Sequence, residues 1–303
     1  MTRTRYAPDR GLTTRMTVTL FLLGLLYVAF VAALVALGVR AIVVLALAAG
    51  LLAVQYFLSD RIALFAMHGR LVTPEQAPEL HGVVDRLAAM ADMPKPRVAI
   101  ADSDVPNAFA TGRNQKNAVV CVTTGMLRRL EPAELEGVLA HEMAHIAHRD
   151  VAVMTIASFL GIVAGLMTRI ALYTGFGGRG SRNNGAPIGL IILLVSALVY
   201  AVSFLLTRAL SRYRELAADR AGALLTQRPS ALASALTKVS GEMARIPTRD
   251  LREAEPFNAF YFAPALSRRG AAAGLAALFS THPPLEQRLA QLHRIAAELG
   301  RGA

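Results

Sequence analysis

The stretch His141-Glu142-Met143-Ala144-His145 brings two imidazoles and a carboxylate together at a spacing that suits metal chemistry. On a helix, residues four positions apart lie on one face, one turn from each other, so both imidazoles can bind the same ion. Glu142 lies about 100° around the helix axis from His141, where it can hold a water molecule beside that ion. This arrangement is typical of metalloproteases, in which the glutamate is the general base. We therefore predict that His141 and His145 are metal ligands and that Glu142 is the catalytic base.

The residues around this motif indicate the helix that the chemistry needs, and we predict it over residues 130–149. Pro132 suits the first helical turn, where its missing N–H costs nothing. Glu134 is favoured in the same region by the helix dipole. Leu135 and Val138 continue an apolar pattern at helical spacing, which supports a helix packed against a core.

A catalytic zinc ion needs three protein ligands and one open position, so a third ligand must come from another part of the chain. Glu215 and Asp219 are four residues apart in a second predicted helix, and they therefore share a face. We expect Glu215 to bind one Zn²⁺ together with the two histidines, and Asp219 to fix a ligating histidine by a hydrogen bond. Asp150 either supports a ligand in the same way or interacts with a helix end.

The composition indicates a membrane protein rather than a soluble enzyme. Hydrophobic residues make up 54% of the 303 residues, and the mean hydropathy is +0.43. A membrane-spanning helix needs about 20 apolar residues, and four apolar segments approach that length: 16–39, 41–58, 151–168 and 186–206. The first two are predicted to form a transmembrane hairpin. The last two either cross the membrane fully or form a hairpin that enters the bilayer or packs on the protein.

Basic residues near these segments predict the orientation of the chain. The net charge is +11, and arginines cluster before the first segment and after the second and the fourth. If all four segments cross, these arginines lie on one side, which the positive-inside rule makes cytoplasmic. The sequence shows no recognition helix and no basic strand interleaved with aromatic residues, so no nucleic-acid partner is expected. A single cysteine, Cys121, excludes an intramolecular disulfide and a cysteine zinc site.

Four consecutive regions follow from these segments. Residues 1–60 are predicted to be a transmembrane hairpin, 61–150 the first part of a peptidase domain, 151–208 a second apolar hairpin, and 209–303 the second part of the peptidase domain. Two crossings by the second hairpin would return the chain to its starting side of the membrane. Topology would then allow the glutamate of the last region to meet the histidines of the second.

The order of motifs resembles the HtpX family of membrane zinc metallopeptidases and, more distantly, the CAAX prenyl proteases. Two N-terminal apolar segments precede PNAFATGR (106–113) and HEMAH (141–145), and two further apolar segments precede ELAAD (215–219) and STHPPLEQRL (280–289). The resemblance covers nearly the whole chain. It implies an α-helical integral membrane protein whose zincin-type peptidase domain is mainly α (α+β), with a small sheet. It also implies a bacterial inner-membrane endopeptidase that faces the cytoplasm and degrades misfolded or damaged membrane proteins.

Several further residues are weaker candidates for the site. His282 is a candidate catalytic donor to the oxyanion, although a histidine before Pro283 can also cap a turn. Arg288, on the next predicted helix, either binds a substrate carboxylate or faces solvent. Asn107 begins a predicted loop, 107–112, that is expected near the cleft.

Two further segments have no settled role. Residues 117–127 are predicted to be a strand, and a substrate could pair with its backbone at Val119 and Val120; plain core packing is the alternative. Residues 255–266 cluster four aromatic side chains that suit a substrate groove, a lid, an interfacial anchor or ordinary core.

Three other functions fit parts of the sequence less well. An inactive scaffold would have no reason to keep Glu142. A metal transporter would carry ionisable side chains inside its spans, and residues 18–39 and 186–206 have none that would be charged at neutral pH. A prenyl-protein processing enzyme would be expected to carry more spans around a large chamber than the four predicted here.

Overall fold

The structure is a computed structural model that describes residues 10–36, 67–150, 185–243 and 282–301, with short stretches between 42 and 65 and between 153 and 168. The chain forms two compact units. One unit combines Met1–Leu12, Leu58–Ala152 and Ser211–Ala303, and the other combines Thr13–Phe57 and Val153–Leu210. The aromatic cluster at 255–266 lies outside the described residues.

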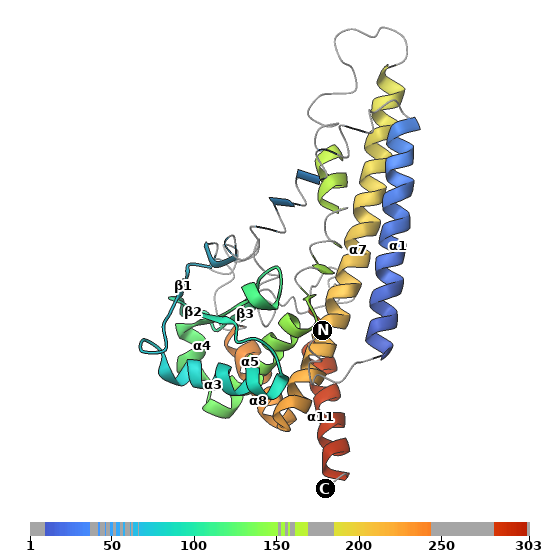
Figure 1. Cartoon of the computed structure of the whole chain (residues 1–303). Coiled ribbons are helices and arrows are strands. Elements are labelled where there is room, and N and C mark those ends of the chain that lie inside the picture. The colour runs from blue at the N-terminus through green and yellow to red at the C-terminus, as the bar shows by residue number, and fades with distance from the viewer. Residues whose placement is uncertain are drawn as a thin grey trace. The chain divides into compact units, whose positions relative to one another are not determined.

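A four-stranded sheet forms part of the first unit (Figure 1). The strands are β1 (Gly69–Leu71), β2 (Arg97–Ala101), β3 (Ala108–Thr111) and β4 (Val119–Thr123), in the spatial order β1-β2-β4-β3. Strands β2 and β4 are parallel, and the two outer pairs are antiparallel. All five residues of β4 are buried, as the run of valines in that strand favours.

Two predictions about this part of the chain were wrong in detail. The strand predicted at 117–127 ends at Thr123, because the Thr123 hydroxyl accepts a hydrogen bond from the Met126 N–H and caps helix α4 (Thr124–Arg129). The loop predicted at 107–112 instead contains strand β3. Register explains this second difference: the Thr123 N–H donates to the Asn107 carbonyl, which starts the antiparallel pairing of β3 with β4.

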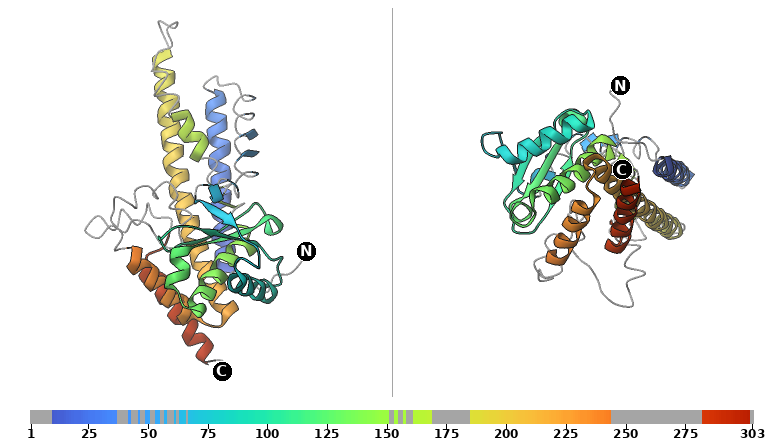
Figure 2. Two further views of the ribbon diagram at one scale, coloured as in Figure 1. Left: turned by 90° about the vertical axis from the view of Figure 1, so that its left-hand side faces the viewer. Right: turned by 90° about the horizontal axis from the view of Figure 1, so that it is seen from below.

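Helices pack on one side of the sheet (Figures 1 and 2). They include α3 (Pro78–Ala91), α5 (Pro132–Ala147) and α8 (Pro229–Met243), and α11 (Leu285–Arg301) packs on α8. Helix α5 contacts β3 and β4 of the sheet as well as α3 and α8. Most of its residues are therefore buried, and the helix predicted over 130–149 is confirmed with slightly shorter ends.

A buried carboxylate joins the start of α5 to α8. Glu134 accepts hydrogen bonds from the Glu131 N–H at 2.9 Å, from the Ser234 hydroxyl at 2.6 Å and from the Lys238 ammonium at 2.8 Å. The first bond satisfies an N–H that has no partner within the helix. The other two fix the position of α5 against its neighbour, and α5 is the helix that carries the histidines.

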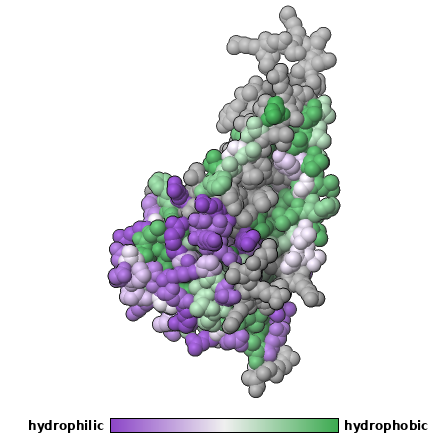
Figure 3. Space-filling model, in the orientation of Figure 1, coloured by the Kyte–Doolittle hydropathy of each residue, from purple (hydrophilic) through white to green (hydrophobic). Residues whose placement is uncertain are grey.

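The second unit is built from long apolar helices. Helix α1 (Arg10–Ala36) buries Leu23, Phe30 and Leu34 in a cluster with Val199 and Leu210 of α7 (Gly185–Thr226). Other large apolar side chains of α1 and of the first part of α7 are exposed, and Figure 3 shows hydrophobic residues along these helices. Among the described residues, two helices, Thr13–Ala36 and Leu190–Thr226, are long and apolar enough to cross a membrane.

Helix α7 is longer than the apolar segment predicted at 186–206. It runs without interruption from Gly185 to Thr226, because no proline or glycine occurs between residues 190 and 221. One helix therefore contains both the apolar segment and the residues predicted to complete the metal site. The predicted segment 41–58 lies largely outside the described residues, whereas residues 153, 154, 157 and 161–168 of the segment 151–168 are described and are helical.

Candidate metal centre

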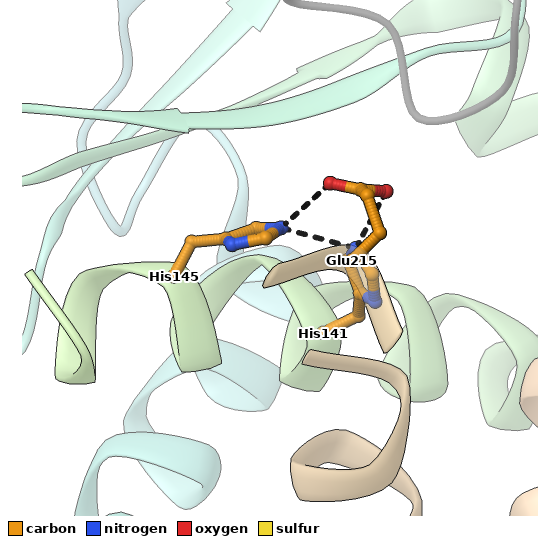
Figure 4. Close-up of side chains that lie close together, drawn as sticks. All are labelled: His141, His145 and Glu215. Atoms are coloured by element: carbon orange, nitrogen blue, oxygen red, sulfur yellow. Dashed lines mark hydrogen bonds and ion pairs between the residues drawn. The ribbon is translucent and has the colours of Figure 1, made fainter. Parts of the chain in front are cut away.

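His141, His145 and Glu215 come together in the first unit, and their side chains point toward one another (Figure 4). The Nε2 atoms of the two histidines are 3.2 Å apart. Glu215 Oε1 lies 3.3 Å from His145 Nε2, and Glu215 Oε2 lies 3.8 Å from His141 Nε2. Ligand atoms bound tetrahedrally at zinc distances are about 3.4 Å apart, so one ion fits between these three side chains.

The formal charge of the surrounding buried groups also suits a divalent cation. Four carboxylates and two guanidinium groups are buried here: Glu142, Asp150, Glu215, Asp219, Arg214 and Arg288. In the protonation state that binds a metal, with all four carboxyl groups ionised and the histidines neutral, four negative charges against two positive ones leave a formal charge of −2. Buried charge of one sign is costly unless it is compensated. A divalent ion would compensate it, and two imidazoles with one carboxylate are donors that zinc accepts.

Helix α7 reaches the histidines because Gly222 lets it approach the backbone of α5. A Cβ atom at this position would lie 2.9 Å from the His141 nitrogen and 3.2 Å from the carbonyl carbon of Ala140. Both are backbone atoms, which cannot swing aside as a flexible side chain can. Glycine at position 222 therefore sets the separation between the helix that carries Glu215 and the helix that carries the histidines.

We expect Gly222→Ala to weaken zinc binding about tenfold and to destabilise the fold by about 1–3 kcal/mol, because the added methyl forces the two helices apart. Chelator competition and thermal unfolding of the purified protein would measure the two effects. Gly241→Ala on α8 is the matched control, since a Cβ there meets no atom within 4 Å. Unchanged zinc affinity in Gly222→Ala would contradict this account of the helix contact.

Each ligating histidine has a carboxylate at its other ring nitrogen. His141 Nδ1 lies 2.9 Å from Asp219 Oδ1. Arg288 in turn donates two hydrogen bonds to Asp219, from Nε to Oδ2 at 2.7 Å and from Nη2 to Oδ1 at 2.6 Å. Such a carboxylate fixes the orientation and the tautomer of a ligating imidazole. Asp219 therefore lies where the sequence predicted it.

Of the two roles predicted for Arg288, the structure excludes exposure to solvent and shows contact with carboxylates of this chain. Its side chain is 2% exposed, so it does not face solvent; it binds the carboxylate of Asp219, and its Nη1 lies 3.7 Å from Glu215 Oε2. The sequence could not show the contact with Asp219, because the two residues lie on different helices and are 69 positions apart. No described contact tests a role for Arg288 in substrate binding.

Asp150 supports the second histidine. Its Oδ2 lies 2.5 Å from His145 Nδ1, and its Oδ1 lies 2.9 Å from the Nε of Arg214, a residue that sequence reasoning missed. Burial favours the neutral acid, but Arg214 and His145 outweigh this effect and hold the pKa of Asp150 below its usual value. Of the two roles considered for Asp150, the structure shows contact with a predicted ligand.

The two histidines differ in their electrostatic surroundings. Burial holds the pKa of His141 below its ordinary value, although Asp219 opposes this shift. Burial acts in the same direction on His145, but hydrogen bonds to Asp150 and Glu215 prevail and raise its pKa to about 10. A metal ion that binds His145 Nε2 must therefore displace a tightly held proton.

Glu142 lies beside the cluster and faces the sheet. Its Oε2 accepts a hydrogen bond from the backbone N–H of Ala110, in strand β3, at 2.9 Å. Burial, with a further contribution from the Glu215 charge, raises the pKa of Glu142 to about 8. A carboxyl group with such a pKa can both take up and release a proton near neutral pH.

His282 also lies at the cluster. The side chain is buried, and its Nδ1 lies 2.8 Å from Glu215 Oε2. Because an ionised carboxylate only accepts hydrogen bonds, this contact places a proton on His282 Nδ1. The structure therefore brings His282 to the predicted site, in contact with a predicted ligand, and its role as an oxyanion donor stays a prediction.

The remaining candidates are less well placed. Val119 and Val120 belong to β4, whose backbone pairs with β2 on one side and with β3 on the other. The central strand has no open edge for a substrate, so this prediction was wrong. Asn107 is fully buried and directly precedes strand β3. Its N–H donates a hydrogen bond to the Thr123 hydroxyl at 2.9 Å. No described contact tests a role for Asn107 in substrate binding.

Comparisons with known proteins agree with this geometry. The model of peptidase family M48 matches residues 74–296. The chain is 66% identical over 299 residues to Protease HtpX homolog 1 of Streptomyces coelicolor, covering 98% of this chain and 97% of that relative. It is 49% identical over 295 residues to Protease HtpX homolog 2 of Methanosarcina mazei, covering 97% of this chain and 99% of that relative.

A solved structure shows that the fold is shared as well. Ste24p of S. mikatae superposes with a TM-score of 0.54 at 19% sequence identity, and the match covers 89% of this chain and 62% of that one. The family and the HtpX relatives confirm the resemblance inferred from the order of the motifs, and they do not favour an inactive scaffold. The chain therefore belongs to peptidase family M48 and is a metalloprotease.

Proposed function

We propose that this chain is a membrane-anchored zinc endopeptidase in which His141, His145 and Glu215 hold one Zn²⁺ and Glu142 is the general base. The observation that carries the proposal is the convergence of two imidazole nitrogens and one carboxylate within tetrahedral ligand distances. When bound, zinc polarises the scissile carbonyl and lowers the pKa of a water molecule to about 7.

The residues around the ion would divide the proton transfers between them. Glu142 Oε2 is held by the Ala110 N–H, so the carboxylate can accept a proton from the attacking water and then deliver it to the leaving amine. His282 carries a proton on Nδ1, toward Glu215. It can donate from Nε2 to the oxyanion when both ring nitrogens are protonated.

Strand β3 is the proposed binding edge for an extended substrate. Among the described residues β3 pairs with β4 alone, and the register places the backbone groups of Ala108 and Ala110 away from β4. The Ala110 N–H points in that direction and is already occupied by Glu142 Oε2, so a peptide would pair with the other outward backbone groups. A peptide that adds to this edge would lie next to the proposed base, and backbone pairing would tolerate many substrate sequences.

The apolar helices suggest where the substrates are. Helices α1 and α7 expose large apolar side chains over membrane-spanning lengths, which suits contact with a lipid bilayer. The arginine distribution supports a site on the cytoplasmic side of the membrane. The order of apolar segments and motifs, which resembles the HtpX family, is the ground for proposing a multi-pass protein of a bacterial inner membrane. Tethering raises the effective concentration of membrane-bound substrates. Misfolded or damaged membrane proteins are therefore the proposed substrates.

The test uses the full-length chain in lipid vesicles with two substrates that share one unfolded sequence, of which one carries a membrane anchor. We expect a chelator to stop cleavage, added Zn²⁺ to restore it, and the anchored substrate to be cleaved faster than the free one. Cleavage that resists the chelator would refute the zinc mechanism. Equal rates for the two substrates would refute the role of the membrane.

A further inference from the structure

Arg214 is a buried cation that the proposed mechanism does not use. The residue is 8% exposed, and its Nε lies 2.9 Å from Asp150 Oδ1. Asp150 is 2% exposed, and its other oxygen contacts His145 Nδ1. The two carboxylate oxygens of Asp150 are thus divided between one guanidinium and one proposed metal ligand. Any displacement of Arg214 would be passed to the imidazole through this single rigid group.

A related arrangement surrounds the other histidine, although Arg288 donates hydrogen bonds to its aspartate whereas Arg214 and Asp150 form an ion pair. Arg288 binds Asp219, and Asp219 lies beside His141. In both series of side chains, a buried arginine contacts an aspartate. The aspartate in turn contacts Nδ1 of a histidine whose Nε2 faces the proposed ion. This arrangement occurs in two separate sets of residues. It indicates that each guanidinium helps to orient an imidazole through the aspartate between them.

Helix α7 contributes to the orientation of all three proposed ligands. Glu215 is itself a ligand, Asp219 supports His141, and Arg214 supports His145 through Asp150. Successive residues on a helix point about 100° apart, so Arg214 and Glu215 can contact different partners although they lie in the same turn. A shift of α7 relative to α5 would therefore disturb the three ligands together.

Arg214 and Asp150 also connect distant parts of the chain. Asp150 directly precedes the apolar segment 151–168, and Arg214 follows the apolar first part of α7 on the same unbroken helix. The pair joins the two ends of the intervening residues at the His145 ring. Separation of those ends would remove the support of His145 even if Glu142 and Glu215 kept their positions.

We propose that Arg214 is a positioning residue that, through Asp150, holds His145 in its metal-binding orientation and joins the two ends of residues 151–213. The inference rests on the proposed metal site. A guanidinium is suited to this task because it is planar and always charged. Its loss would leave Asp150 as a buried carboxylate without its cation, free to turn away from the imidazole.

The test measures metal retention rather than proteolysis. The full-length protein is loaded with Co²⁺, its visible absorption spectrum is recorded, and the release of cobalt to a chelator is timed. We expect Arg214→Gln to lose cobalt about 10–100 times faster than the unchanged chain and to alter the spectrum, because the His145 ligand is misoriented. Arg214→Lys keeps the charge without the planar fork and should be intermediate. Arg220→Gln, at a half-buried position of the same helix whose side chain pairs with Glu298 rather than with the metal centre, should have no effect.

A double variant separates positioning from general destabilisation. If the unpaired Asp150 carboxylate causes the defect, Arg214→Gln combined with Asp150→Asn should release cobalt more slowly than independent single effects predict, because the buried charge is gone. Release from Arg214→Gln at the rate of the unchanged chain would overturn the inference, as would strictly independent effects in the double variant. Failure of the unchanged chain to bind cobalt would instead refute the metal site and, with it, this inference.

Discussion

Glu142→Gln should reduce the rate of peptide hydrolysis by about 10²–10⁴-fold while the zinc content of the purified chain stays unchanged. Glutamine has nearly the shape of glutamate, and its amide oxygen can still accept the hydrogen bond from the Ala110 N–H. It cannot take a proton from the attacking water. The loss is therefore expected in the rate of the chemical step, with the proposed metal ligands left in place.

The measurement is cleavage of an unfolded substrate such as casein by detergent-purified protein, together with metal analysis of each sample. Glu131→Gln is a matched control at the exposed start of the same helix, and it should retain full activity. Equal activity of Glu142→Gln and the unchanged chain would indicate a contaminating protease or another catalytic site. Loss of zinc from Glu142→Gln would show that this carboxylate holds the metal rather than the water.

Glu215→Gln is expected to have a different signature, with loss of both the metal and the activity. The substitution keeps the size of the side chain but removes the charge that faces His141 and His145. Loss of a partner that supports a ligand typically weakens metal affinity 10–100-fold, and loss of a direct ligand should cost about 100-fold or more. High zinc concentrations should restore part of the activity, which cannot occur in Glu142→Gln.

Zinc affinity would be measured by competition with a chromogenic chelator, and activity would be followed over a range of free zinc. Glu298→Gln, at an exposed position on α11, provides the control for a glutamate change away from the site. Zinc affinity that remains unchanged in Glu215→Gln would remove this residue from the ligand set. The third ligand would then have to be sought elsewhere, starting with Asp219, which lies one turn further along α7.

Local spacing was enough to predict the centre of the site. His141, Glu142 and His145 lie on one predicted helix, and Glu215 and Asp219 lie on another, so helical periodicity alone indicates which side chains share a face. The structure places these residues together at the proposed centre. Such predictions depend on contacts between residues that are three or four positions apart, which a sequence displays directly.

Predictions that depended on distant parts of the chain were less successful. An apolar run with β-branched residues identified a strand at Val119, but the position of a strand within its sheet depends on partners that the run does not contain. Arg288 looked like a surface or substrate-binding residue because its aspartate partner lies far away in the sequence. Arg214 was overlooked for the same reason, since its partner Asp150 precedes the intervening apolar segments.

The hydrogen bond between Ala110 and Glu142 has a consequence for inheritance. The donor is a main-chain amide, which every amino acid except proline supplies. A missense change in codon 110 therefore leaves this hydrogen-bond donor in place unless it introduces proline. A donor on a side chain, by contrast, could be removed by many single-nucleotide changes. The orientation of the proposed base is thus buffered against point mutation at the position that supports it.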